Sequence, residues 1–243
     1  MRLVLSVMAM CLAVGVLGPG ARAAVVTVPL AVPGGDDSGW DASYDDSIVA
    51  ISVNSVDPGG SVEITIEKDF LQPPNPVTGL FPPILIDFIQ RLPDAQTAPT
   101  IYVLDESIHN GTGVHWTDFH WEVLNQGEAW FDADGSTDFG IEPPEFTEVK
   151  MVPPFLNQHW GTRPSDPNQV VILDVDGGLG IAPDGSFSPS PGSSMLVIQT
   201  DLEGTEALLS FTFKQFPTPE PTTLALMGVG AVGMALARRR RRG

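Results

Sequence analysis

The feature that most constrains this chain is a strict alternation of apolar and polar residues over 62–67. In a β-strand the apolar members would all lie on one face; they are Val62, Ile64 and Ile66. In the preceding segment, 47–56, a strand would place Val49, Ile51 and Val53 on one face and Ile48, Ala50 and Ser52 on the other. Between the two segments, Asp57-Pro58-Gly59-Gly60 is typical of a turn. We therefore predict a β-hairpin here, with its clearest buried face on the second strand.

Strand-like segments recur along the chain, and loops rich in Pro and Gly separate them. The other strand candidates are 25–32, 84–90, 100–107, 114–124, 170–175, 195–200 and 207–216. Between the two ends of the chain, no segment shows helical periodicity over about 11 residues or more. The pattern predicts an all-β fold, an antiparallel β-sandwich of the Ig-like or jelly-roll-like kind. Residues 215–218 are interpreted as a linker that follows this domain.

The N-terminus has the layout of a secretory signal peptide. Arg2 supplies a positive charge, Leu3 to Leu17 is apolar, and Ala21-Arg22-Ala23 places small residues where a signal peptidase reads them. An apolar run of roughly 15 residues is short for a bilayer span, which needs about 20. We predict that residues 1–23 are removed and that the mature chain begins at Ala24; an N-terminal membrane anchor is the alternative.

The C-terminus combines three features in order. Pro219-Glu220-Pro221 comes first, the apolar run Leu224 to Ala237 follows, and a basic cluster closes the chain: Arg238, Arg239, Arg240, Arg241 and Arg242. The prolines keep the motif extended, the apolar run enters a bilayer, and the arginines stay on the cytoplasmic side. Such a run, about 14 residues long, is short for a stable anchor. A plain C-terminal membrane anchor is the alternative.

Residues 219–243 resemble the PEP-CTERM sorting signal of exported bacterial proteins. The resemblance implies recognition by an exosortase-type membrane peptidase, removal of the tail, and delivery to the cell surface or an extracellular polysaccharide matrix. The membrane would then be a partner only through the C-terminal segment before processing. The expected organisation is a signal peptide (1–23), an acidic β-domain (24–216) and a sorting signal (217–243).

Charge narrows what the central domain binds. The two terminal signals contain seven of the twelve basic residues and one of the thirty acidic residues. The central domain therefore keeps five basic and twenty-nine acidic residues, and its net charge is −24. So acidic a surface repels nucleic-acid phosphates and anionic lipid headgroups, which excludes nucleic acid as a partner. The single cysteine, Cys11, lies within the signal peptide. The mature domain therefore has no disulfide and no cysteine chemistry.

Two acidic motifs are candidate ion sites. Asp132, Asp134 and Asp138 have a spacing similar to short calcium-binding loops of extracellular folds, in which alternate residues turn carboxylates inward. The alternative is an acidic Asp-Gly turn that needs no ion. Asp174-Val175-Asp176-Gly177 and Asp184-Gly185 are weaker cases, interpreted mainly as turns. Calcium is thus the one candidate cofactor, and none is required.

A second candidate site lies after the glycine-rich turn 110–113, which we interpret as the tip of a hairpin over 106–124. A strand there places Asp118, His120 and Glu122 on one face, as metal ligands or acid–base groups. The alternative, which the pattern favours, is that Phe119 and Trp121 on the other face fill the core while the polar face is solvated.

The chain has no Gly-x-Ser-x-Gly and no His-Glu-x-x-His motif. Its five tryptophans could include a sugar-stacking platform, although in a β-sandwich most tryptophans fill the core; they are Trp40, Trp116, Trp121, Trp130 and Trp160. We predict a non-catalytic cell-surface or matrix protein associated with exopolysaccharide. A secreted glycan-active enzyme or carbohydrate-binding module is the alternative. Expected partners are signal peptidase, an exosortase-type peptidase and extracellular polysaccharide.

Overall fold

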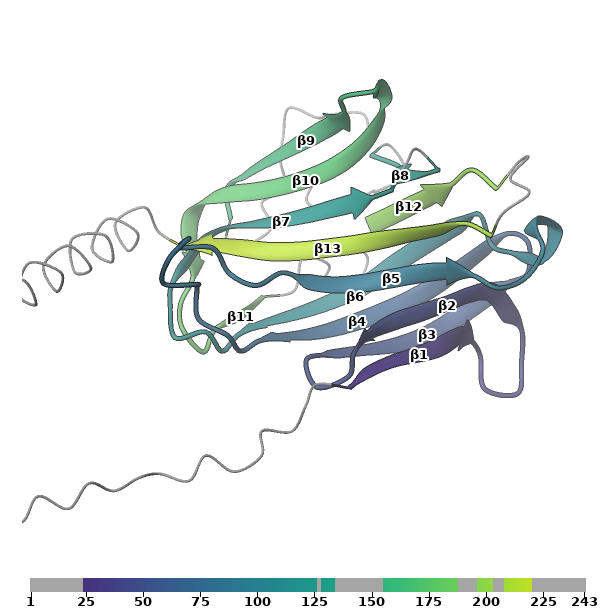
Figure 1. Ribbon diagram of the computed structural model, residues 1–243, viewed down its shortest axis with the longest axis horizontal. Helices are drawn as coiled ribbons and strands as arrows, with labels where there is room; N and C mark the ends of the chain where they lie inside the picture. The colour runs from purple at the N-terminus through teal and green to yellow at the C-terminus, as the bar shows by residue number, and fades with distance from the viewer. Residues whose placement is uncertain (1–23, 126–127, 134–154, 188–195, 203–207, 220–243) are drawn as a thin grey trace, which may run out of the picture.

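The computed structural model describes residues 24–125, 128–133, 155–187, 196–202 and 208–219, and within them it is all-β, as predicted (Figure 1). The strands are β1 (Val25–Ala31), β2 (Asp37–Asp45), β3 (Val49–Asp57), β4 (Ser61–Phe70), β5 (Ile84–Gln90), β6 (Thr100–Asn110), β7 (Trp116–Leu124), β8 (Ala129–Phe131), β9 (Asn157–Arg163), β10 (Asp166–Ile181), β11 (Ser186–Phe187), β12 (Leu196–Thr200) and β13 (Ser210–Pro219). A 3-10 turn, Asp94–Gln96, precedes β6. The signal peptide and the apolar run 224–237 lie outside the described residues.

The strands form one connected sheet in the order β1-β2-β5-β13-β7-β10-β8-β12-β6-β4-β3, with β9 paired to β10 and β11 to β6. The predicted hairpin is confirmed, because β3 pairs antiparallel with β4. The expectation of a purely antiparallel sheet is wrong at one pair, since β4 and β6 run parallel. Between them the chain leaves to form β5, which pairs with β2 and β13, and it returns in the original direction. A parallel pair requires such a crossover.

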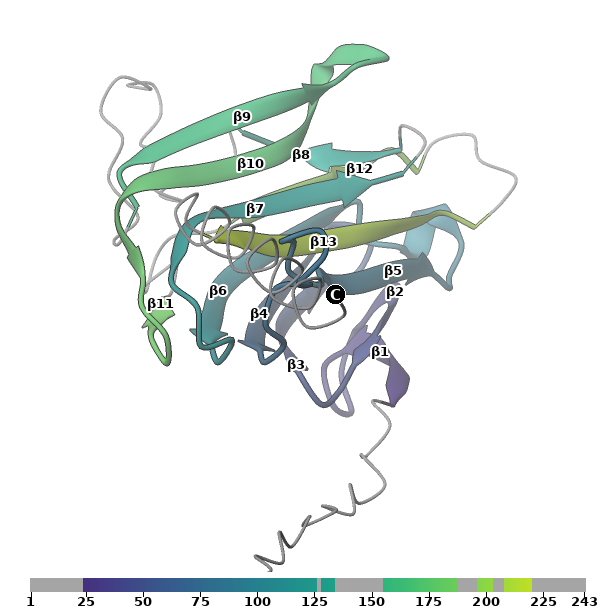
Figure 2. The same cartoon turned by 60° about the vertical axis from the view of Figure 1, so that its left-hand side comes forward.

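The sheet folds over so that its two halves face each other across the core. Figures 1 and 2 show β5, β13 and β7 lying across from β6, β4 and β3. Side chains meet across this space: Gln215 of β13 contacts Lys68 of β4, and Trp121 of β7 donates a hydrogen bond to Glu106 of β6. The finer Ig-like or jelly-roll-like assignment stays a prediction.

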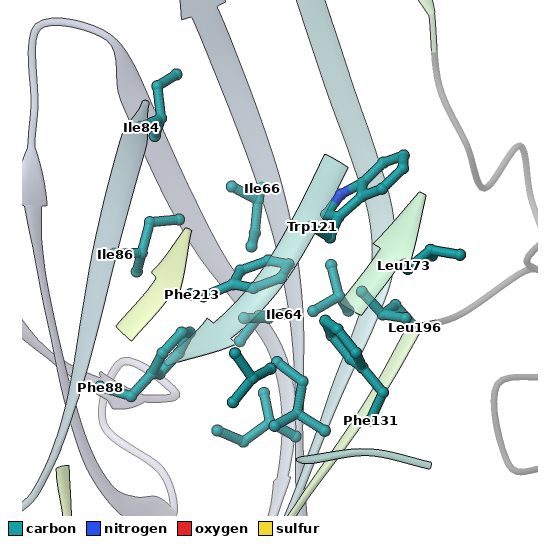
Figure 3. Close-up of a cluster of buried hydrophobic side chains, with 14 of the residues drawn as sticks. Ile64, Ile66, Ile84, Ile86, Phe88, Trp121, Phe131, Leu173, Leu196 and Phe213 are labelled. Carbon is teal, nitrogen blue, oxygen red and sulfur yellow. The ribbon is translucent and has the colours of Figure 1, made fainter. Parts of the chain in front are cut away.

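The core lies between these two halves and follows from the period-two pattern (Figure 3). The three β-branched residues of β4 that alternate with polar ones are completely buried; they are Val62, Ile64 and Ile66. Phe88 of β5 and Phe213 of β13 face them, and both are fully buried. Burying one such side chain stabilises the fold by about 1.5–3 kcal/mol, so this alternation accounts for much of the packing.

The glycine-rich turn 110–113 is not the tip of a hairpin. β6 pairs with β4, β11 and β12, whereas β7 pairs with β10 and β13, so the turn carries the chain from one half of the sheet to the other. The Asn110 side chain holds this corner: its Nδ2 donates to the Val114 carbonyl at 2.8 Å, and its Oδ1 accepts from the Thr112 hydroxyl at 2.6 Å. The local turn chemistry was recognised correctly, but its strand partners were not.

The predicted linker at residues 215–218 is also wrong, because these residues form the end of β13. Up to Gln215, β13 pairs with β5 on one side and with β7 on the other. Pro217 and Pro219 fall beyond the stretch paired with β5, where only β7 is a partner. Proline lacks the N–H that a second neighbour would need, and strands tolerate it where one side is open.

Candidate functional site

The most informative surface surrounds the point at which β13 runs into the Pro-Glu-Pro motif. Pro217 lies opposite Phe119 and Thr218 lies opposite Asp118, so the last residues before the motif belong to the sheet. The Thr218 backbone N–H donates to Asp118 Oδ1 at 2.8 Å, and the Thr218 hydroxyl contacts the same oxygen. One carboxylate therefore holds both the backbone and the side chain of the residue that precedes Pro219.

His120 binds two carboxylates from different strands. Its Nδ1 lies 2.6 Å from Asp174 Oδ1 of β10, and its Nε2 lies 3.4 Å from Asp118 Oδ1, close enough for a charge contact without a well-aligned hydrogen bond. The ring also stacks on Phe216, with centroids 4.7 Å apart. The three residues Asp118, His120 and Asp174, here named the His120 triad, join β13, β7 and β10 at the start of the sorting motif.

The triad keeps His120 protonated at neutral pH. Burial disfavours the charged ring, but the contacts with Asp118 and Asp174 outweigh it and raise the pKa of His120 to about 9. Burial also acts to raise the pKa of Asp118, yet the contact with the His120 ring and the hydrogen bonds from Thr218 lower that pKa below its usual value. A histidine held as a cation between two carboxylates is a poor general base, so the arrangement favours fastening strands over proton transfer.

The surrounding outer face is polar and largely paired. Lys214 of β13 lies 2.7 Å from Glu122, and its Nζ sits 4.4 Å from the centroid of the Phe216 ring. On the other side of the triad, Asn157 of β9 donates to Asp176 at 2.6 Å, and His159 lies 3.4 Å from the other oxygen of that carboxylate. These contacts form a ladder across β9, β10, β7 and β13.

The sequence placed Asp118, His120 and Glu122 on one face correctly, and Phe119 and Trp121 are buried as predicted. The structure brings only the first two together, since Glu122 pairs with Lys214 instead. Sequence reasoning missed Asp174 as the partner of His120. No local sequence pattern indicates Asp174, because it lies 54 residues from His120 in the chain. The two residues meet only because β10 pairs with β7.

The ion-site predictions have different outcomes. Among the residues that the structure describes, no group of three or more His, Cys, Asp or Glu side chains is arranged to hold a metal ion. Asp134 and Asp138 lie outside the described residues, so calcium at the acidic loop stays a prediction. Asp132 is described, and its backbone N–H donates to the Val197 carbonyl at 2.9 Å. Asp184 has a φ of +60°, as expected for the turn at Asp184-Gly185.

Three of the five tryptophans cannot form a sugar platform. Trp40, Trp116 and Trp121 are completely buried, and each indole N–H donates a hydrogen bond inside the protein. Trp130 and Trp160 are half-buried. Trp130 lines an open groove of about 480 Å³ together with Asp94 and Asp201.

Comparison with known proteins identifies the end of the chain. Residues 217–242 match the family model of the PEP-CTERM protein-sorting motif, as the sequence predicted. The motif indicates an exported protein that is sorted by exosortase. Such a protein is anchored transiently through its C-terminus. No curated protein and no solved structure matches the chain. Within the described part of the chain, no helix has the length and apolar character to cross a membrane.

Proposed function

We propose that this protein is a non-catalytic component of the cell surface or extracellular matrix, displayed by exosortase processing and associated with exopolysaccharide. The observation that carries the proposal is the continuity of β13 with the sorting motif. Thr218 is hydrogen-bonded to Asp118, and Pro219, the first residue of the motif, is the last residue of the strand. Cleavage near the motif would leave the new C-terminus directly at the sheet.

A strand end fixed in this way suits a protein that is held at the cell surface more than an enzyme that turns over a substrate. The His120 triad joins β7 to β10, and its Asp118 holds Thr218 of β13, the residue next to the motif. Any attachment made at the processed C-terminus would transmit force straight into a strand that has two hydrogen-bonded neighbours over residues 212–215. The large negative charge of the domain keeps neighbouring copies soluble at a crowded surface.

The second candidate function is a secreted glycan-active enzyme or carbohydrate-binding module. The groove beside Trp130 favours it, because an aromatic ring next to carboxylates offers stacking and hydrogen bonds to a sugar. The carboxylates that line this groove are Asp94 and Asp201.

The test compares a host that has exosortase with an isogenic strain that lacks it. With exosortase, the protein is expected in the matrix fraction with an intact mass that lacks the basic cluster at 238–242. Without exosortase, the tail should be retained and the protein should remain with the membranes. The same mass and fraction in both strains would refute sorting.

A second measurement tests the finer part of the proposal. Calorimetry of the matrix-purified protein with exopolysaccharide from the same host should give a binding signal and no new reducing ends. Reducing ends that appear with time, and that disappear in Asp201→Asn, would identify the enzyme instead. Absence of both binding and turnover would refute the association with polysaccharide.

A further inference from the structure

A charged network lies inside the core, between the two facing halves of the sheet. Lys68 of β4 contacts the side chains of Glu106 on β6 and Gln215 on β13, and both the Lys68 and the Glu106 side chains are completely buried. Gln215 is also completely buried. Its Nε2 donates to Glu106 Oε1 at 3.0 Å, and Trp121 Nε1 donates to Glu106 Oε2 at 2.7 Å. The three side chains therefore converge in a site that is closed off from the protein surface.

The surroundings of this site are apolar. Lys68 Nζ lies 5.7 Å from the centroid of the Phe213 ring, and Ile66 on the same strand is fully buried. Desolvation lowers the pKa of Lys68 to about 8, against the opposing effect of Glu106. A lysine in such a site supplies a neutral amine far more readily than a surface lysine, and a neutral amine is a nucleophile.

We propose that Lys68 and Gln215 join in an intramolecular amide bond, with Glu106 carrying the protons. The amine nitrogen Nζ contacts Oε1 of Gln215, the oxygen bonded to the carbon Cδ that it would attack. The leaving nitrogen Nε2 is hydrogen-bonded to the same Glu106 oxygen that contacts Nζ. The nucleophile, the electrophile and the proton carrier are thus all in place without a cofactor.

The reaction balances within these three side chains. Glu106 accepts a proton from the Lys68 ammonium, which leaves a neutral amine and a neutral carboxylic acid. The amine lone pair attacks Cδ of Gln215 and forms the Nζ–Cδ bond. Glu106 donates its proton to Nε2, the Cδ–Nε2 bond breaks, and ammonia leaves. A further proton from Nζ returns to Glu106.

The products explain why such a network lies in the core. A buried ion pair carries a large desolvation cost, and replacing it with neutral groups is often neutral or stabilising. The reaction converts the ammonium and the carboxylate into a secondary amide and a neutral acid. Gln215 is the acyl donor because its carboxamide can release ammonia once Nε2 is protonated, whereas Glu106 already binds Trp121 and Gln215 as a hydrogen-bond acceptor.

The cross-link would join distant segments covalently, as a disulfide does, in a chain whose mature domain has no cysteine. It joins residues 147 positions apart and fastens the last strand, β13, to β4 in the opposite half of the sheet. Force applied at the sorting motif would first load the pairing of residues 216–219 with β7. The covalent bond at Gln215 would then carry the force before it reached the rest of β13.

Mass spectrometry of the exported wild-type protein tests the proposal directly. The expected mass is about 17 Da below that of the linear sequence, which corresponds to one ammonia. After digestion, tandem spectra should contain a branched peptide in which Lys68 is joined to Gln215. A folded wild-type protein with the full linear mass would overturn the proposal. A loss of about 18 Da, with Lys68 joined to Glu106, would overturn the assignment of Gln215.

Two variants separate chemistry from folding. Glu106→Gln keeps the size of the side chain but cannot carry the proton, so it should show the full linear mass. The matched control is Glu122→Gln, which removes the partner of Lys214 on the outer face and should retain the loss of ammonia. Retention of that loss in Glu106→Gln would refute the role of Glu106. If Glu106→Gln does not fold, the wild-type mass still decides the proposal.

Discussion

The His120 triad predicts a specific dependence of stability on pH, which the variant His120→Gln isolates. The folded pKa of His120 is about 9 and its ordinary value is 6.5. Because the folded pKa is raised, the stabilisation is fully present below pH 6.5 and is lost as the pH rises through 9. At 1.36 kcal/mol per pKa unit, the shift corresponds to about 3 kcal/mol. The side chain is only 19% exposed, so solvent screens this contribution little.

The assay is urea unfolding followed by the fluorescence of the buried tryptophans, at pH values from 6 to 10. The free energy of unfolding of the wild type should exceed that of His120→Gln most at pH 6. The excess should shrink by about 3 kcal/mol towards pH 10. Taking the difference matters, because an unreacted Lys68 has a lowered pKa and would add stability as the pH rises from about 8.

His109→Gln is the matched control. His109 also contacts an aspartate, Asp69 at 3.1 Å, but both side chains are well exposed, and exposed ion pairs contribute about 0–1 kcal/mol. Its unfolding free energy should therefore follow the wild type across the pH range. A difference between the wild type and His120→Gln that stays constant from pH 6 to 10 would refute the account of the triad.

Further outcomes are expected elsewhere in the chain. Phe213→Ala removes a fully buried ring from the core and should cost about 3–5 kcal/mol in urea unfolding. Asp118→Asn weakens the hold on Thr218, so hydrogen exchange at the Thr218 amide should quicken while β4 amides stay protected. Millimolar calcium should raise the melting temperature, and Asp134→Asn should reduce that rise; an equal rise with sodium at matched ionic strength would argue against a site. Sequencing of the exported protein should begin at Ala24, and recovery of Met1 would contradict signal cleavage.

The features that could be predicted from the sequence depend on residues that are close together in the chain. The alternation at Val62, Ile64 and Ile66 reports which face of a strand is buried, because both faces are visible in consecutive residues. The burial of Phe119 and Trp121 follows from the same rule. Prolines misled the interpretation of residues 215–218, since a strand with one open side accommodates them as well as a linker does.

The sites depend on contacts that no local pattern contains. His120 meets Asp174 and Lys68 meets Gln215 only because distant strands are placed in a particular register. Lys68 continues the alternation of Val62, Ile64 and Ile66, which places it on the buried face of β4 although its charge is typical of a solvent-facing residue. Its partner there, Glu106, is not marked by any local pattern. The glycine-rich turn at 110–113 shows the same limit, since its chemistry specifies a corner and leaves open which strands the corner connects.

The position of β13 has a consequence for how the protein matures during export. It is the last strand of the described chain, yet it lies between β5 and β7 rather than at an edge. Until residues 210–219 have crossed the membrane, β5 and β7 lack the strand that lies between them, and the hydrophobic side chains that β13 covers stay open to water. A chain that crosses N-terminus first therefore completes its fold only as the Pro-Glu-Pro motif itself emerges. The domain therefore completes its fold at the same stage of export at which the cleavage motif becomes accessible.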